Sequence, residues 1–253
     1  MTIPIYEGEV PSLTTEQMIE VDRAMIQDLR IELIQMMENA GRHLAHLARM
    51  RFFEGSPRGK KVVILAGTGG NGGGALVCAR RLHTWGAHVQ IIVTHPPADF
   101  PPVPAHQLDI VQRMNVPVTG ADALAQVHSP ELIVDGLIGY RLKGIPHGTV
   151  ADLIRWANAQ TAPVLALDVP SGVDGTSGAV FDPAIRATAT MTLALPKAGL
   201  FAPEAQAWVG ELYLADIGVP PSLYAEPALS LRMGALFAES EILRLDAPHH
   251  EPR

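Results

Sequence analysis

The chain has 253 residues, of which 47% are hydrophobic and 18% are charged, and its 19 Lys and Arg against 26 Asp and Glu give a formal net charge of −7. This is the composition of a folded globular protein, which excludes intrinsic disorder and a coiled coil. Because the surface as a whole does not attract phosphate backbones, we expect no nucleic-acid partner.

The amino terminus and the cysteine content bear on the compartment. The first residues, MTIPIYEGEVPS, lack the basic and apolar regions of a signal peptide, and no run in the sequence approaches the roughly 18 apolar residues that span a bilayer. The single cysteine, Cys78, cannot form an internal disulfide. We therefore expect a cytoplasmic protein with no membrane partner.

Two helices are predicted ahead of the first strand. Thr14 can cap the first helix, and Gln17, three residues later, can complete a capping box. Apolar residues then recur on one face of a 3.6-residue period. In the first helix these are Met18, Val21 and Met25, and in the second they are Met36, Met37, Ala40, Leu44 and Leu47.

From Lys61 onward, short apolar runs alternate with amphipathic stretches. The runs are residues 61–66, 87–94, 131–137, 162–170, 188–196 and 210–218, and the stretches are 73–86, 104–114 and 149–158. Alternation of strand and helix is typical of right-handed parallel βαβ units, and runs that are apolar throughout indicate strands covered on both faces. We therefore predict an α/β fold: a three-layer α/β/α, mostly parallel, doubly wound sheet with an N-terminal helical extension.

One domain, residues 1–220, accounts for these elements. The remaining segment, 221–253, has little periodicity, so we expect a weakly structured C-terminal extension. We expect its last residues, DAPHHEPR, to be mobile.

A cluster of glycines lies between the first strand and the helix that follows it. Gly67, Gly69 and Gly72 have the G-x-G-x-x-G spacing in the strand-to-helix context that this motif requires. Without side chains, backbone N–H groups at the start of a helix can approach a phosphate, so the turn is a candidate pyrophosphate site. The alternative is a tight turn that needs glycine only for its own backbone.

Two related nucleotide sites are disfavoured by the same stretch. A P-loop closes its glycine run with Lys and Ser or Thr, whereas this run closes on Gly74 and Ala75. An NAD-dependent dehydrogenase carries an acidic residue at the end of its second strand, whereas this strand ends in Thr94 and His95. We therefore expect a nucleotide to bind here in a geometry that differs from those of a P-loop and of an NAD-dependent dehydrogenase.

Three acidic residues follow predicted strands. Asp135 and Asp168 each end a buried strand, and the carboxyl ends of parallel strands face the ligand crevice. Asp168 could be a general base or a ribose ligand, and Asp135 could instead cap the loop after it. Asp174 precedes a glycine and more simply makes an Asx turn. Cys78 is expected to be a small core residue, and no transition-metal site is expected among the histidines.

Several segments, in consistent order over roughly residues 13–220, resemble the YjeF N-terminal domain family. They are LTTEQMIEVDRAMI, MMENAGR, GTGGNGGGALVCARRL, LIVDGLIGYRLKG, LALDVPSGVDGTSG, LALPKAGL and VGELYLADIGVP. The resemblance implies a Rossmann-like fold, a homodimer, and NAD(P)H-hydrate epimerase activity, which interconverts the R and S epimers of hydrated NADH and NADPH. It also implies a potassium ion beside the nucleotide.

Site residues follow from the resemblance by motif. It implies substrate contacts from Gly70, Asn71, Gly72, Gly73, Gly74, Gly139, Tyr140, Arg141, Leu142, Lys143, Gly144, Ile145 and Asp168. Potassium ligands would be Asn71, Asp135 and Ser171, all oxygen donors that suit a hard cation. We take Asp168 as the catalytic base, and no residue is identified as the general acid.

The chain departs from the family pattern at two loops. The family turn reads G-x-G-N-N-G-G-D-G, whereas Gly70, Gly74 and Ala75 stand here for the first Asn, the Asp and the last Gly. Loss of that Asp would remove a hydroxyl acceptor and an acid or base. The second loop, G-T-G-L in the family, has Tyr140 and Arg141, which could add a phosphate contact or occlude the pocket.

These departures leave two kinds of function open. The first is an isomerase, a monofunctional epimerase whose dehydratase partner is a separate chain, because the 35 residues left after Gly218 (253 − 218) are too few for the dehydratase domain of bifunctional relatives. The second is a non-catalytic nucleotide-binding or scaffold module of the same fold. A third possibility, again an enzyme, is an isomerase that acts on a related nucleotide metabolite. The sequence does not distinguish NADHX from NADPHX as substrate.

Overall fold

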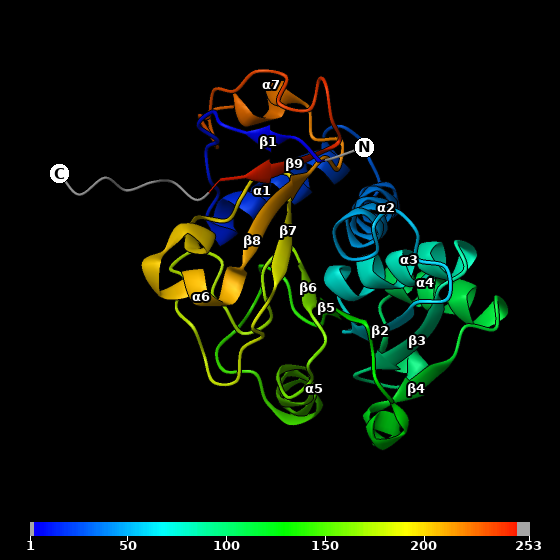
Figure 1. Ribbon diagram of the computed structural model, residues 1–253. Helices are drawn as coiled ribbons and strands as arrows, with labels where there is room; N and C mark the ends of the chain where they lie inside the picture. The colour runs from blue at the N-terminus through cyan, green and yellow to red at the C-terminus, as the bar shows by residue number, and fades with distance from the viewer. Residues whose placement is uncertain (1–2, 247–253) are drawn as a thin grey trace.

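A nine-stranded sheet runs through the computed structural model, which describes residues 3–246 (Figure 1). In spatial order its strands are β1 (Ile5–Tyr6), β9 (Ile242–Leu245), β8 (Glu211–Ala215), β7 (Ala189–Leu193), β6 (Val164–Leu167), β5 (Leu132–Gly136), β2 (Lys61–Ala66), β3 (His88–Val93) and β4 (Val118–Gly120). Neighbouring strands are parallel except β8 and β9, which are antiparallel. The sheet confirms the predicted fold class.

Helices cover both faces of this sheet (Figure 1). The α-helices are α1 (Thr15–Gln27), α2 (Leu33–Phe52), α3 (Gly70–Thr84), α4 (Pro102–Arg113), α5 (Gly148–Asn158), α6 (Gln206–Val209) and α7 (Pro221–Tyr224), and 3-10 turns lie at Pro97–Asp99, Ala121–Gln126, Ala198–Phe201 and Pro203–Ala205. Alternate residues of β2 serve the two layers. Ile64 packs with α2 and α3, and Leu65 packs with Ile154 of α5.

The predicted start of α1 is confirmed. The backbone N–H of Gln17 donates to Thr14 Oγ1 at 3.2 Å, and the Thr14 N–H donates to Gln17 Oε1 at 2.9 Å, which completes the capping box. The predicted apolar faces of α1 and α2 are buried. Cys78 lies buried in α3, as expected for a core residue.

The C-terminal segment corrects one expectation. Residues 221–246 are not a weakly structured appendage, because α7 packs beside α1 and β9 inserts between β1 and β8. The pairing of Leu243 with Leu214 was missed because β9 has only four residues and no flanking pattern to mark it. The expected mobile tail falls mainly on residues 247–253, which lie outside the described part of the chain.

The order of the strands positions the ligand crevice. From β2 the chain winds to β3 and β4 on one side, and then returns to β5 on the other side of β2. In doubly wound sheets the crevice opens at such a reversal, beyond the carboxyl ends of the strands. The turn after β2 and the loop after β5 therefore lie at the same place.

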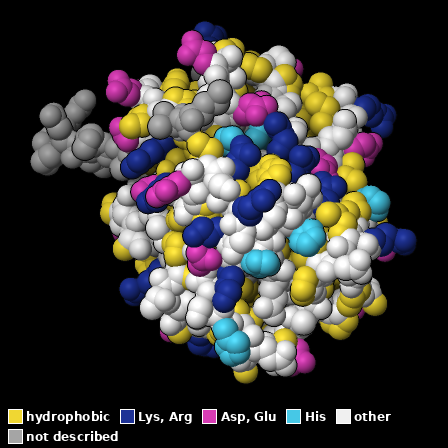
Figure 2. Space-filling model, turned by 45° about the vertical axis from the view of Figure 1, so that its right-hand side comes forward, with side chains coloured by type: hydrophobic (Ala, Val, Ile, Leu, Met, Phe, Trp, Pro, Cys, Tyr) yellow, Lys and Arg dark blue, Asp and Glu magenta, His cyan; other side chains and the backbone are white. Residues whose placement is uncertain are grey.

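Small residues allow α2 and α3 to pack closely over that place. A Cβ built on Gly41 would lie 2.4 Å from the Val77 Cβ, and one on Gly73 would lie 2.4 Å from the Met37 sulfur. Figure 2 shows Lys and Arg side chains on the face that this layer presents to solvent. Between the two helices, Arg80 of α3 is ion-paired with Glu38 of α2 at 2.5 Å. Among residues 3–246, no helix is long and apolar enough to cross a membrane.

Candidate functional site

A cavity of about 630 Å³ opens at the predicted crevice. One wall carries most of the polar groups, together with the apolar Leu137 and Ile138, and consists of Gly69, Gly70, Asn71, Leu137, Ile138, Gly139, Tyr140, Arg141, Asp168 and Lys197. The opposite wall, from α1, α2 and nearby segments, includes Met18, Ile19, Asp22, Ile26, Leu33, Met36, Met37 and Ile217. One cavity therefore has a polar side built from strand ends and a largely apolar side built from the N-terminal helices.

The glycine turn supplies the start of α3 to this cavity. Gly69 is the N-cap, and a Cβ on Gly69 or Gly70 would meet nothing within 4 Å, so both face open space. Gly67 and Gly72 are glycines for a different reason. A Cβ on Gly67 would lie 2.1 Å from the Leu137 carbonyl oxygen, and one on Gly72 would lie 1.7 Å from the Gly67 carbonyl oxygen.

The last three glycines of the cluster do not line the cavity. Gly72, Gly73 and Gly74 are buried within the first turns of α3, and their contact with a substrate stays a prediction. A Cβ on Gly74 would lie 2.9 Å from the Leu167 Cδ2. The Leu167 side chain therefore packs against Gly74. It fills the space that the Asp of the family pattern would need, so no gap is left in the cavity wall.

The three residues predicted to hold an ion surround one tripeptide, residues 137–139. Asp135 Oδ1 accepts from the Leu137 N–H at 3.1 Å. Ser171 Oγ accepts from the Ile138 N–H at 2.9 Å and donates to Asp135 Oδ1 at 2.6 Å. A Cβ on Gly139 would lie 2.7 Å from Asn71 Oδ1. The side chains come from α3 and from the ends of β5 and β6, and the fold brings them together.

This cluster fits a monovalent cation. Asn71 Nδ2 donates to the Leu167 carbonyl at 2.7 Å, which turns its carbonyl oxygen toward Gly139. Asp135 is fully buried, and among the described residues no Lys, Arg or His is ion-paired with it. Burial raises the pKa of Asp135 to about 6 against the lowering effect of the Ser171 and Leu137 hydrogen bonds. A buried carboxylate among neutral oxygen donors is an environment that a hard cation would stabilise.

Asp168 lies at the cavity in a constrained conformation. It follows β6 with a φ of 68°, in the left-handed region that few residues other than glycine, asparagine and aspartate adopt. Its Oδ2 accepts from the Tyr140 N–H at 3.2 Å, and its Oδ1 is bonded to Lys197 Nζ. The carboxylate is therefore fixed between the second loop and a buried ammonium.

Lys197 is a cavity-lining residue that the sequence reasoning missed. Its side chain is fully buried, and Nζ also donates to the Leu193 carbonyl at 2.9 Å. The signal was present as a lysine within the apolar segment LALPKAGL, because a lysine is almost never fully buried unless it is paired. Lys197 and Asp168 give the cavity an acid and a base in direct contact.

The second loop reaches the cavity only through its first residues. Gly139, Tyr140 and Arg141 line it, whereas Leu142, Lys143, Gly144 and Ile145 do not, and the contacts of these four with a substrate stay a prediction. Tyr140 does not block the cavity. Its hydroxyl turns to α1 and donates to Asp22 Oδ2 at 2.5 Å, so its ring forms part of the wall.

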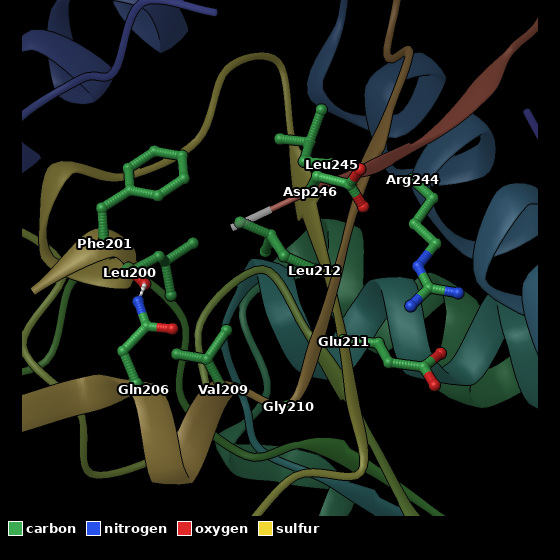
Figure 3. A pocket seen from close by; sticks show the side chains of 10 residues that line it. All are labelled: Leu200, Phe201, Gln206, Val209, Gly210, Glu211, Leu212, Arg244, Leu245 and Asp246. Carbon is green, nitrogen blue, oxygen red and sulfur yellow. Dashed lines mark hydrogen bonds between the residues drawn. The ribbon is translucent and has the colours of Figure 1, made fainter. Parts of the chain in front are cut away.

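A smaller hollow of about 250 Å³ lies where α6 meets β8 and β9 (Figure 3). Gln206 Nε2 donates there to the Leu200 carbonyl at 3.5 Å, and the other lining groups include Arg244 and Glu211. None of the predicted site residues lines this hollow. The candidate site is therefore the larger cavity at the strand ends.

Comparisons with known proteins point to one family. The family model described as YjeF-related protein N-terminus matches residues 33–199. The NAD(P)H-hydrate epimerase of Dehalogenimonas lykanthroporepellens is 39% identical over 95% of this chain and 96% of its own length. The NAD(P)H-hydrate epimerase of Rhodopirellula baltica is 33% identical over 85% of this chain and 87% of its own.

Longer relatives and a solved structure extend this result. The Bifunctional NAD(P)H-hydrate repair enzyme Nnr of Salinibacter ruber is 35% identical over 83% of this chain, which spans 41% of that enzyme. The crystal structure of yeast YNL200c superposes with a TM-score of 0.78 at 21% identity, over 93% of this chain and 100% of that one. At this identity the superposition shows the fold alone.

Proposed function

The chain belongs to the family of YjeF-related proteins, and from this membership we propose that it is an NAD(P)H-hydrate epimerase, an isomerase that interconverts the R and S forms of hydrated NADH and NADPH. The observation that supports this most directly is the buried contact between Asp168 and Lys197 at the cavity. A base and an acid in contact are what an epimerisation by proton transfer needs.

The epimeric carbon of the substrate is C6 of the nicotinamide ring, which carries the added hydroxyl and is bonded to the ring nitrogen. Inversion requires one of these bonds to break and to form again on the opposite face. When the bond to nitrogen breaks, its electron pair stays on nitrogen, which gains a proton, and the hydroxyl loses its proton as the C=O bond forms. Closure of the ring on the other face reverses both transfers.

Within this scheme Asp168 accepts the hydroxyl proton and Lys197 supplies the proton to the nitrogen. Lys197 is suited to this role because its ammonium is anchored by Asp168 and by the Leu193 carbonyl, so its position is fixed before the substrate binds. The Tyr140 N–H bond to Asp168 holds the carboxylate toward the cavity. The apolar wall, with Met36 and Met37, excludes water from the reacting ring.

The start of α3 and the ion cluster would bind the anionic part of the substrate. Gly70 and Asn71 present backbone N–H groups of the first helical turn to the cavity, where the helix dipole favours a phosphate. Asn71, Asp135 and Ser171 would hold potassium, whose charge would offset that of the pyrophosphate. We further propose that the protein is a cytoplasmic homodimer.

The proposal is tested by incubating the purified protein with R-NADHX and potassium, and following the S epimer by chromatography against the spontaneous reaction. We expect the S epimer to appear at a rate proportional to enzyme concentration. A rate equal to that of the blank, together with retained nucleotide binding, would establish the non-catalytic binding module instead.

A further inference from the structure

Three side chains that line the cavity connect α1 to the second loop. The Tyr140 hydroxyl donates to Asp22 Oδ2 at 2.5 Å, the Arg141 Nε donates to the Tyr140 hydroxyl at 2.8 Å, and the Arg141 Nη2 donates to Asp22 Oδ2 at 3.3 Å. Each member bonds to the other two. We call Asp22, Tyr140 and Arg141 the α1 bridge.

The α1 bridge fixes the guanidinium of Arg141 in one orientation. Its carbon lies 5.3 Å from the centroid of the Tyr140 ring, so the cation lies over the ring face while two of its nitrogens are bonded. A freely rotating arginine loses considerable side-chain entropy when it binds a ligand, and this arginine has lost it already. The side chain nevertheless remains 61% exposed at the cavity, with Nη1 free of any bond to a described residue.

The other charges at the cavity leave Arg141 as the cation available to a ligand. Lys197 is bonded to Asp168 in the interior. Arg23 is paired with Glu20 at 2.7 Å and with Asp28 at 2.8 Å. The bond from Arg141 to Asp22 is longer, and Asp22 is already satisfied by the shorter bond from Tyr140. The unbonded Nη1 can therefore donate to an incoming phosphoryl group while Nε and Nη2 keep their bonds to Tyr140 and Asp22.

Asp22 is acceptable beside an anionic ligand because of the same contacts. It is largely buried, and burial raises its pKa despite the lowering effect of the Tyr140 hydroxyl bond. The hydrogen bonds from the Tyr140 hydroxyl and the Arg141 Nη2 offset the charge of its carboxylate toward an anionic ligand. Its hydrogen bond to Tyr140 then acts mainly to hold the loop.

We infer that Asp22 is a positioning residue, which through Tyr140 sets the guanidinium of Arg141 to bind a phosphoryl group of the substrate. This inference rests on the proposed function for the identity of the substrate, a hydrated nicotinamide dinucleotide. The phosphoryl group can belong to the pyrophosphate, which NADHX and NADPHX share, or to the 2′-phosphate, which only NADPHX carries. A guanidinium suits either one, because it donates two parallel hydrogen bonds.

The test combines the variants Arg141→Gln, Asp22→Asn and the double variant, with Arg113→Gln as a control on an exposed arginine that pairs with Asp109 away from the cavity. For Arg141→Gln we expect KM to rise about tenfold, because one charged contact with the substrate is lost, and kcat to change less than twofold. A rise for NADPHX alone assigns the contact to the 2′-phosphate, and an equal rise for both substrates assigns it to the pyrophosphate.

The double variant separates positioning from a merely structural role. If Asp22 acts through Arg141, the double variant has the KM of Arg141→Gln alone, and Asp22→Asn by itself shows a smaller rise of the same substrate dependence. Additive effects of the two substitutions, or a KM unchanged in Arg141→Gln, would overturn the inference. A fall in kcat for Asp22→Asn without a change in KM would do so as well.

Binding of unmodified NADH and NADPH by calorimetry keeps this test independent of turnover. The proposed function fails if the wild-type protein binds these nucleotides but does not exchange the epimers. In that case the affinities of the four variants still decide the role of the α1 bridge by the same comparison. Absence of NADPH binding by the wild-type protein would overturn the inference itself.

Discussion

Lys197 and Asp168, 29 residues apart in the chain, form an ion pair in which the side chains are 0% and 3% exposed. Removal of two charges from water is costly, and a buried pair is retained only where its geometry is fixed by further hydrogen bonds. Here the Leu193 carbonyl and the Tyr140 N–H provide them. The position of this pair at the wall of the largest described cavity favours a role in chemistry over a role in stability alone.

Replacement of Lys197 by Met should stop turnover and destabilise the fold together. Without the ammonium, Asp168 would be a buried carboxylate with no ionic partner, which costs about 3 to 5 kcal/mol. The epimerisation rate should fall by about 100-fold or more, because one proton donor is lost. The double variant with Asp168→Asn should recover most of the melting temperature but none of the rate. Recovery of the rate would contradict the assignment.

Potassium should stabilise the protein through Asp135. We expect the melting temperature at pH 7.5 to rise when choline chloride is replaced by KCl at equal ionic strength, and Asp135→Asn to abolish this rise. Burial raises the pKa of Asp135 to about 6. Without potassium, the contribution of Asp135 to the free energy of unfolding is therefore favourable below the ordinary pKa of an aspartate and is lost as the pH rises through 6. The stabilisation by potassium should instead increase with pH, because potassium binds the ionised carboxylate, and it should disappear near pH 5. An equal potassium effect in Asp135→Asn would exclude this site.

The two kinds of glycine in the turn should respond differently to a methyl group. Gly72→Ala places Cβ 1.7 Å from the Gly67 carbonyl oxygen, a backbone atom that cannot move aside, so we expect destabilisation by about 3 kcal/mol or more. Gly70→Ala meets nothing within 4 Å and should leave the stability within about 1 kcal/mol of the wild type. Urea unfolding of both variants measures this. Equal stability would show that the turn is looser than described.

The ion pair between Arg51 of α2 and Glu211 of β8 should stabilise the fold in a pH-dependent way. Arg51 donates to both Glu211 oxygens at 2.8 Å, and this bond lowers the pKa of Glu211 to about 2 against the effect of burial. Because the folded pKa is lowered, the stabilisation is present above the ordinary pKa and is lost as the pH falls toward 2. Glu211→Gln should cost about 1 kcal/mol at pH 7, since the pair is partly exposed. The difference from the wild type should shrink between pH 4.5 and 3, and a constant difference would refute this.

Much of the architecture could be predicted from the sequence because its periodicity is local. The capping box at Thr14 and the apolar runs of β2, β5 and β6 are each specified within a few residues. The strands that escaped prediction, β1, β4 and β9, have two to four residues and are held by partners far away in the chain. Their stability comes from tertiary pairing, for which no local pattern exists.

The part of the candidate site that could be predicted consists of residues that belong to a sequence motif and also lie near the end of a predicted strand. Asn71, Asp135 and Ser171 were expected from their motifs to share one site, and the structure places all three around residues 137–139. Their ligation of potassium stays a proposal. The lysine within the apolar segment LALPKAGL was a signal for burial, but its partner Asp168 could not be predicted, because the pairing depends on how the segment after β7 folds back. The contribution of α1 to the cavity wall was also missed, because it too depends on tertiary packing.

The assignment of Asp168 is tested most directly by Asp168→Asn. Asn adopts the left-handed conformation as readily as Asp, but it leaves the buried Lys197 without its ionic partner, so we expect a lower melting temperature, and binding of NADPH shows that the assayed variant is folded. Asp174→Asn is the matched control, because Asp174 caps the turn at Thr176 outside the cavity. With R-NADHX as substrate, we expect Asp168→Asn to show only the spontaneous rate of epimer exchange and Asp174→Asn to show the wild-type rate. Wild-type exchange by Asp168→Asn would contradict the account.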